Sequence, residues 1–280
     1  MILAPILLLA FLFILGLAIG SFLNVVIMRS ERGEVLTGRS HCDTCKKTLI
    51  WRELIPLLSF VYQKGRCRNC GTVLSVQYPV VEFATGFVFA ATAGTMLYEA
   101  ILTGNIFSLL AVCVLLACVA AMIVVVVTDI NYHIILNGSV LVLAILGVVV
   151  AIARNGLICI PGDASCTSFS FYDLALDVGA SIGAVAFLFA LWFFSKGRAM
   201  GFGDVKLIGA TSLLLGFPLS ILALLFSFWL GGIWGVGLLV ARMRNLKSQI
   251  AFGPFIIAGT VLAFLFGKSF LMSSGFYYLL

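Results

Sequence analysis

The sequence predicts an all-α, polytopic membrane protein with about eight transmembrane helices and one polar, cysteine-bearing loop. Of its 280 residues, 62% are hydrophobic and only 10% are charged, and the mean hydropathy is +1.21. Apolar stretches of about 20 residues, long enough to cross a bilayer as helices, recur along the whole chain. A secretory signal would instead give one short apolar region followed by a globular chain.

The apolar segments set the predicted spans, and one of them is short. As a helix, residues 206–217 would reach only about 18 Å, well below a hydrocarbon core of about 30 Å. Gly216 and Pro218 predict a turn at its end. Such a helix is tolerated in a membrane if its free carbonyls face protein or a water-filled cavity. The predicted spans are 2–28, 79–98, 106–127, 134–153, 174–194, 206–217, 219–241 and 250–273.

The basic residues predict the orientation of these spans. Residues 29–78 hold nine Lys and Arg, residues 195–206 hold three and residues 242–249 hold three, while only Arg154 and Lys268 fall on the other side. The positive-inside rule makes the basic side cytoplasmic and places both termini on the far side. The formal charge of +6 therefore reports orientation, and we expect no nucleic-acid partner.

The polar stretch 29–78 carries two C-x-x-C pairs separated by 21 residues. Four thiolates at this spacing can close a tetrahedron around Zn²⁺. Because so small a lobe has few core-forming residues, the metal would have a structural role. Redox-active pairs or unbound thiols are the alternative. The predicted zinc ligands are Cys42, Cys45, Cys67 and Cys70.

The other four cysteines divide into two pairs. Cys113 and Cys118 lie within a predicted span, where packing is their ordinary role. Cys159 and Cys166 lie together in a loop on the far side, where an oxidising compartment would permit a disulfide.

Two acidic residues lie where apolar spans meet the cytoplasmic side, Asp129 and Asp204. Charged groups at membrane depth are costly and usually face a cavity or a partner. Gly201 and Gly203, just before Asp204, have no side chain to obstruct an extended peptide. Two carboxylates that share a proton can hydrolyse a peptide bond without a metal. Each aspartate could also be a simple interfacial residue or helix cap.

These residues together resemble the type IV prepilin peptidases, which belong to the G-x-G-D group of intramembrane aspartyl proteases. In that family the first catalytic aspartate opens a stretch that ends in Pro-Asp or Pro-Asn, whereas Asp129 leads here to Leu136-Asn137. The resemblance implies that Asp129 and Asp204 are the catalytic pair and that the four loop cysteines are zinc ligands. It rests on Gly20-Ser21-Phe22-Leu23-Asn24-Val25, Arg29, both cysteine pairs, Trp51, Glu53 to Leu57, Ser59, Gly65-Arg66-Cys67-Arg68, Tyr78-Pro79, Glu82, Met200 to Lys206 and Phe252-Gly253-Pro254-Phe255.

The resemblance also implies a substrate, a location and a second activity. The expected reaction is removal of the basic leader from type IV prepilins or type II secretion pseudopilins, after a glycine, at the cytoplasmic face of the bacterial inner membrane. N-methylation of the new terminus by S-adenosylmethionine would follow, although no glycine-rich nucleotide loop marks a site for this cofactor. The predicted parts are a first helix 1–28, a zinc loop 29–78 and a peptidase core 79–280.

Two other classes of function remain open at this level. In an ion-coupled transporter with a zinc-bearing regulatory loop, Asp129 and Asp204 would bind a cation or relay protons. An inverted internal repeat would favour that class, and none is evident in the sequence. In a polytopic scaffold of a secretion machine, the aspartates would have no chemical role.

Overall fold

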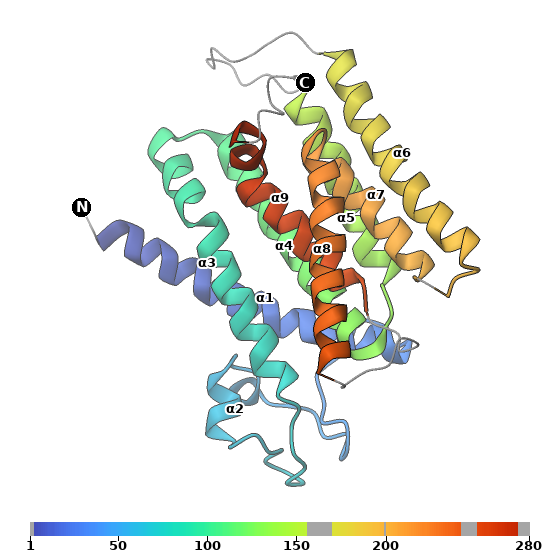
Figure 1. The fold of residues 1–280 in the computed structure, drawn as a ribbon. Coiled ribbons are helices and arrows are strands. Elements are labelled where there is room, and N and C mark those ends of the chain that lie inside the picture. Colours follow the sequence, from blue (N-terminus) through green and yellow to red (C-terminus); the bar gives the residue numbers. More distant parts are fainter. Residues whose placement is uncertain (1–2, 156–169, 199, 242–250, 274–280) are drawn as a thin grey trace. The chain divides into compact units, whose positions relative to one another are not determined.

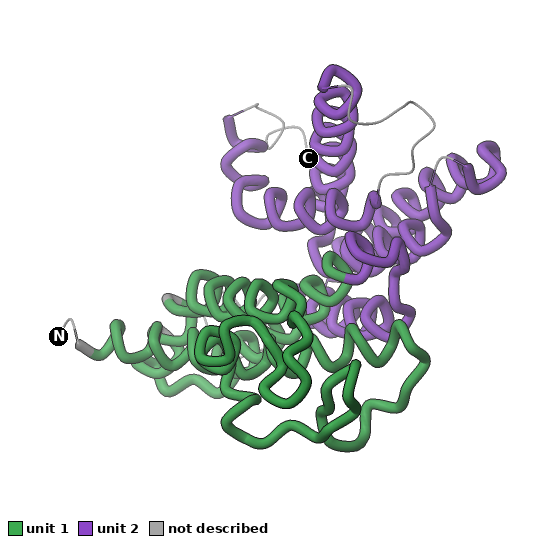
Figure 2. The backbone as a smooth tube through the Cα atoms, turned by 90° about the horizontal axis from the view of Figure 1, so that it is seen from below, with its two compact units in different colours: residues 1–127 green, residues 128–280 purple. Residues whose placement is uncertain are grey.

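The computed structural model describes residues 3–155, 170–198, 200–241 and 251–273, which are helical apart from loops and two isolated β-bridges. They form two compact units, residues 1–127 and 128–280 (Figure 2). The helices of the described residues are α1 Leu3–Arg32, η1 Trp51–Glu53, α2 Leu58–Tyr62, α3 Gln77–Thr103, α4 Ile106–Tyr132, α5 Asn137–Arg154, α6 Phe171–Phe194, α7 Phe202–Leu215, α8 Leu219–Val240 and α9 Gly253–Ser273 (Figure 1).

Six of the described helices are long and apolar enough to cross a membrane: α1, α4, α5, α6, α8 and α9. Helix α3 is a seventh if its two parts, bent by 52°, count as one span. In each of these six helices, at most 39% of the residues in an 18-residue apolar stretch are buried. Most of their apolar surface therefore faces outward, as it does in proteins whose solvent is lipid. Helix α7 has 14 residues and is not among them, in keeping with the shortness predicted for that segment.

In the first unit, α1 and α3 pack side by side (Figure 1). Their backbones approach so closely that a Cβ atom on Gly16 would lie 2.6 Å from the Cα atom of Gly86. Only glycine allows this contact, which is common between membrane helices. Leu12, Ala93 and Val112 bury the contact of α1, α3 and α4. The helix pair thus fixes both ends of the loop that carries the C-x-x-C pairs.

In the second unit, α7 lies at the centre, and α5, α6, α8 and α9 all pack against it. Eight of its 14 residues are buried, so this helix is enclosed by protein rather than by lipid. Leu222, Ala223 and Ala263 bury the contact between α8 and α9. The predicted turn after α7 is present, and Gly216 adopts a φ of +71° that favours glycine.

The carbonyl groups at the end of α7 bind an arginine. The Arg154 guanidinium donates to the carbonyl oxygens of Leu214 at 3.3 Å and Leu215 at 2.7 Å. It also forms an ion pair of 2.6 Å with Asp177 of α6. The second oxygen of Asp177 accepts from the backbone N–H of Phe217 at 2.7 Å. The free carbonyl groups at the end of α7 are therefore hydrogen-bonded to protein side chains. This is the condition under which a short helix is tolerated in a membrane.

Candidate functional site

Asp129 lies near the end of α4, and its side chain is held by a segment far along the chain. The residue is 5% exposed. The backbone N–H of Gly253, at the start of α9, donates to its Oδ2 atom at 2.8 Å. A Cβ atom on Gly253 would lie only 2.6 Å from that oxygen, so the contact requires glycine. The amide groups of a helix N-terminus also favour a carboxylate at this place.

Asp204 lies in the first turn of α7 and is also 5% exposed. Its Oδ2 atom accepts from the backbone N–H of Gly201 at 3.1 Å, which fixes the carboxyl group over the G-x-G-D loop. Asp204 is thus the third residue of the helix, and its carboxylate accepts from the N–H of the N-cap residue, so it does help to cap the helix, one of the ordinary roles open to it. Most side chains that cap a helix are exposed to solvent, whereas Asp204 is buried. Burying a carboxylate costs free energy, so its burial suggests a role beyond capping.

One side chain joins the loops that hold these two aspartates. Ile135, between α4 and α5, packs against both glycines: a Cβ atom would lie 3.0 Å from Ile135 Cβ if placed on Gly203, and 3.4 Å from its Cδ1 if placed on Gly253. The structure thus brings the two predicted aspartates into one buried site within the second unit.

The turn between α4 and α5 forms without the proline that the resemblance to the prepilin peptidases led us to expect. Leu136 adopts a φ of −67° and a ψ of 124° as the residue that precedes the first turn of α5. A proline would have almost the same φ, near −65°. The next residue, Asn137, accepts a hydrogen bond of 3.1 Å from Lys206 of the second aspartate motif. The leucine therefore preserves the turn, and the turn contacts the other motif directly.

The four loop cysteines form one cluster in the first unit. The sulfur atoms of Cys42, Cys45, Cys67 and Cys70 all lie within 4.8 Å of one another. Those of Cys42 and Cys70 are 3.8 Å apart, and the edge of a tetrahedron with Zn–S bonds of 2.3 Å is about 3.8 Å. Hydrogen bonds with Thr72 lower the pKa of the Cys70 thiol to about 6, which favours the thiolate that binds metal. The donor set fits zinc.

Each C-x-x-C pair is part of a tight turn with the same hydrogen bonds. The N–H of Lys46 donates to the carbonyl of Cys42 at 2.8 Å, and the N–H of Gly71 donates to that of Cys67 at 2.8 Å. Lys46 and Gly71 also share a positive φ, of 55° and 73°. The repetition explains how two distant segments present their sulfurs in the same way.

The remaining cysteines lie outside this cluster. On α4, Cys118 is buried, as expected for packing, whereas Cys113 is exposed on the helix surface. Cys159 and Cys166 lie outside the described residues, so the predicted disulfide stays a prediction.

The chain resembles known proteins in both of its units. Residues 14–96 match the bacterial peptidase A24 N-terminal domain, and residues 116–236 match the type IV leader peptidase family. A prepilin leader peptidase/N-methyltransferase of Bacillus subtilis (strain 168) is 32% identical over 264 residues, which are 93% of this chain and 95% of the relative. The chain belongs to the type IV leader peptidase family.

A second family member shows the same extent of similarity. The prepilin leader peptidase/N-methyltransferase of Aeromonas salmonicida (strain A449) is 30% identical over 291 residues, which are 92% of this chain and 90% of the relative. No solved structure matches this leader peptidase family member. Family and helices together make the chain a multi-pass membrane protein of a bacterial peptidase family.

The sequence of this leader peptidase family member did not reveal every residue that builds the site. Gly253 lies in a segment that resembles the family, but no local sequence pattern indicates that its N–H binds Asp129. Asp177 was not predicted to matter, although an aspartate inside the apolar segment 174–194 is itself a signal of a buried partner. That partner is Arg154, one of the two basic residues that the predicted topology places on the far side.

Proposed function

We propose that this chain is an aspartic endopeptidase that removes the basic leader of type IV prepilins or type II secretion pseudopilins, cutting after a glycine. The observation that carries the proposal is the pair Asp129 and Asp204, each 5% exposed and each held by a glycine N–H. Neither carboxyl group forms a salt bridge with a described lysine or arginine. Aspartic proteases hydrolyse peptide bonds with two buried carboxyl groups that lie in one site and have no basic partner.

The chemistry follows from a pair that shares one proton. The ionised carboxyl takes a proton from the attacking water, while the protonated one donates to the oxygen of the scissile carbonyl. The glycine N–H groups orient both side chains without competing for the proton, since each one binds a single carboxyl oxygen. The G-x-G-D loop has no side chain at Gly201, where a Cβ atom would come no closer than 3.5 Å to Asp204 Oδ2, so an extended backbone can approach there, whereas Ile135 fills the space beside Gly203.

The test is to replace each acid by its amide. Asp129→Asn and Asp204→Asn keep the shape and polarity of the side chain but cannot transfer the proton. The rate of prepilin cleavage, measured by mass spectrometry, should fall by about 10²-fold to 10⁴-fold. Asp173→Asn is the matched control, because Asp173 is an exposed residue in the first turn of α6. Full activity in either site variant, with normal membrane insertion, would rule out the aspartate pair.

We further propose that α7 makes an eighth crossing. Helices α5 and α7 run in the same direction: Lys206 binds Asn137 at 3.1 Å near their starts, and Arg154 binds the Leu215 carbonyl at 2.7 Å at their ends. Helix α7 therefore extends along most of α5, which is a candidate span of 18 residues. With eight crossings, 15 of the 17 Lys and Arg fall on one side, which supports a cytoplasmic aspartate site in the inner membrane.

This orientation is tested by labelling intact cells with a membrane-impermeant thiol reagent after mild reduction. Cys159 and Cys166 should react, because the charge count places their loop in the periplasm. The four cluster cysteines should be spared until the cells are permeabilised, which is the internal control. The reverse pattern would separate the aspartates from the cytoplasmic leader, and the proposed reaction would have to be withdrawn.

The proposed function includes a structural zinc ion and a second reaction. Zn²⁺ would be held with no open position, so its contribution is to fold the loop, and its ligands would be Cys42, Cys45, Cys67 and Cys70.

The relatives are named as N-methyltransferases as well as peptidases, and we propose the same second step here. S-Adenosylmethionine, when bound, would supply the methyl group that is added to the new terminal amine, whose proton would go to solvent.

A further inference from the structure

A group of apolar side chains in and just before α2 is exposed on the surface of the first unit. We call this group the apolar patch, and its members are Ile55 at 37% exposed, Leu58 at 68%, Val61 at 73% and Tyr62 at 84%. The last three are spaced as neighbours on one face of a helix. Single exposed apolar residues are ordinary, whereas a whole apolar helix face turned outward calls for a partner.

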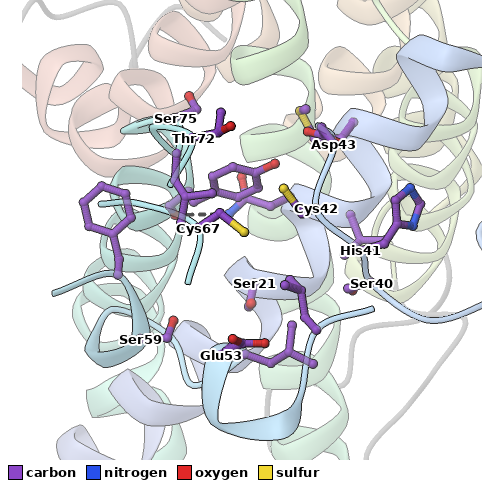
Figure 3. A pocket seen from close by; sticks show the side chains of 18 of the residues that line it. Ser21, Ser40, His41, Cys42, Asp43, Glu53, Ser59, Cys67, Thr72 and Ser75 are labelled. Carbon is purple, nitrogen blue, oxygen red and sulfur yellow. Dashed lines mark hydrogen bonds between the residues drawn. The ribbon is translucent and has the colours of Figure 1, made fainter. Parts of the chain in front are cut away.

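The opposite face of α2 is turned toward the first unit and includes polar groups. Ser59 lies on the wall of a cavity in that unit, as Figure 3 shows, and Gln63, just after α2, lines the same cavity. The ring of Phe60 packs against Gly65, 3.2 Å from where a Cβ atom on that glycine would lie. Helix α2 therefore turns polar side chains inward and apolar ones outward, which is the reverse of a helix at a water surface.

Helix α2 begins beside the apolar part of the α1–α3 pair. The N–H of Leu57, the residue before α2, donates to the carboxylate of Glu82 on α3 at 2.8 Å. Glu82 lies opposite Gly20 of α1, where a Cβ atom would be 2.8 Å from the Glu82 Cα atom. The first charged residue of α1, Arg29, comes nine residues after Gly20, or about 13 Å along the helix. The start of α2 is thus bound inside the level at which α1 becomes charged.

At this level, the outward surfaces of α1 and α3 are themselves apolar. Phe22 on α1 is 56% exposed, and Val80 and Phe83 on α3 are 57% and 52% exposed. Helix α1 is a candidate membrane span, and α3 is one if its two parts count together. Apolar surfaces of this kind face lipid in a membrane protein. Because α2 is bound beside them, its own apolar patch meets the same solvent.

The residues around the apolar patch are typical of the lipid headgroup region. Trp51 is 68% exposed, and the guanidinium carbon of Arg52 lies 5.2 Å from the centre of its ring. Lys64 follows the patch and is exposed. Tryptophan and tyrosine concentrate where lipid meets water, and basic side chains are attracted to lipid phosphates. The whole stretch 29–78 has nine basic residues against four acidic ones, so its charge is complementary to a phospholipid surface.

We propose that residues 55–62 lie in the surface of the adjoining lipid leaflet, with the apolar patch against acyl chains and Arg52 and Lys64 at the phosphates. The segment would thereby hold the cysteine-bearing loop against the membrane. This inference requires a chain that spans the membrane, and it does not depend on the aspartate chemistry. A water-soluble protein partner is disfavoured, because it would have to reach below the level of Arg29.

The test is photo-crosslinking of the full-length protein in liposomes of phosphatidylethanolamine and phosphatidylglycerol. The crosslinker p-benzoylphenylalanine takes the place of Tyr62, and mass spectrometry identifies what it bonds to after irradiation. We expect lipid adducts. With the crosslinker in place of Arg39, an exposed charged residue of the same loop, lipid adducts should be about 10-fold fewer, because that position faces water. Equal lipid adducts at the two positions would overturn the inference.

A charge within the apolar patch provides the second arm. Val61→Asp, read with the crosslinker at Tyr62, should reduce lipid adducts about 10-fold, since an aspartate is costly to place in lipid. Val35→Asp is the matched control, because Val35 is a 75% exposed valine of the same loop outside the patch, and it should change nothing.

The identity of the adduct separates lipid from the other partners that could cover the patch. Crosslinks to a second copy of the chain, to peptides of the second unit or to an added prepilin, in place of lipid, would make the patch a protein-docking surface and overturn the inference. If Val61→Asp fails to insert, the comparison of Tyr62 with Arg39 still decides. Prepilin cleavage is measured separately, so a failure of the proposed peptidase reaction leaves this result unchanged.

Discussion

Asp129 and Gly253 are 124 residues apart in the sequence and are joined by a hydrogen bond of 2.8 Å from the glycine N–H to the aspartate Oδ2. The bond ties the end of α4 to the start of α9, so the position of one carboxyl group depends on how the last described helix begins. It also leaves no space at Gly253, where a Cβ atom would lie 2.6 Å from the same oxygen.

We predict that Gly253→Ala lowers cleavage without unfolding the protein. The new methyl group must push the Asp129 carboxyl out of position, and a displacement of about 1 Å at a reacting group costs about 10²-fold in rate. Prepilin cleavage at saturating substrate, measured by mass spectrometry, checks this.

The control for that variant is Gly179→Ala, because a Cβ atom on Gly179 of α6 would meet no atom within 4 Å. It adds the same methyl group to an open helix surface and should leave the rate unchanged. Equal rates for both variants would show that the Gly253 contact does not position Asp129.

For the metal, we predict about one zinc per chain, lost in Cys42→Ser. Metal binding can contribute about 10 kcal/mol or more to folding a lobe with so little core, so the loop 33–76 should become sensitive to proteases. Elemental analysis and limited proteolysis measure the two effects. Cys113→Ser is the matched control, since Cys113 is an exposed thiol outside the cluster. Zinc retained in Cys42→Ser, or absent from fresh tag-free wild type, would contradict a four-cysteine site.

The departure from the family at Leu136 gives a further prediction, that Leu136→Pro is tolerated. The native φ of −67° is that of proline, and a proline at a compatible position stabilises a protein by about 0.4–1 kcal/mol by restricting the unfolded chain. Thermal unfolding in detergent should shift upward slightly, with cleavage retained.

Leu141→Pro supplies the contrast, because Leu141 lies inside α5, where proline removes a helical hydrogen bond and costs about 3 kcal/mol. A loss of stability in Leu136→Pro as large as in Leu141→Pro would mean that the turn differs from the one described.

The sequence predicted the parts of the site that local patterns encode. Apolar length located every helix of the second unit, and C-x-x-C spacing located the cysteine cluster, because both signals depend on residues close in the chain. The hydrogen bond from Gly253 to Asp129 and the packing of Ile135 against Gly203 and Gly253 could not be predicted. Both join segments more than 60 residues apart and depend on how the helices pack. The predicted count of about eight spans exceeds what length and composition support among the described helices, which is six or seven, because α7 has only 14 residues.

The last prediction concerns the ion pair between Arg154 and Asp177, whose side chains are 37% and 5% exposed. Besides Arg154, Asp177 accepts from the Phe217 N–H at 2.7 Å and from Asn155 at 2.9 Å. Asp177→Ala would therefore leave several buried donors unpaired, and breaking a buried pair in this way costs about 3–5 kcal/mol. Arg154→Ala should cost less, because the arginine is 37% exposed and Asp177 keeps its hydrogen bonds from Phe217 and Asn155.

We expect the double variant to be less destabilised than the sum of the two single variants, since the second change removes a partner that the first has already stranded. Thermal unfolding of the four proteins in detergent completes the cycle. Cleavage should fall with stability in each, because the C-terminal end of α7 is fixed by these residues and Asp204 lies at its other end. If the losses in unfolding free energy were strictly additive, the two side chains would act independently. The end of α7 would then be held by its packing against α5, α6, α8 and α9 alone.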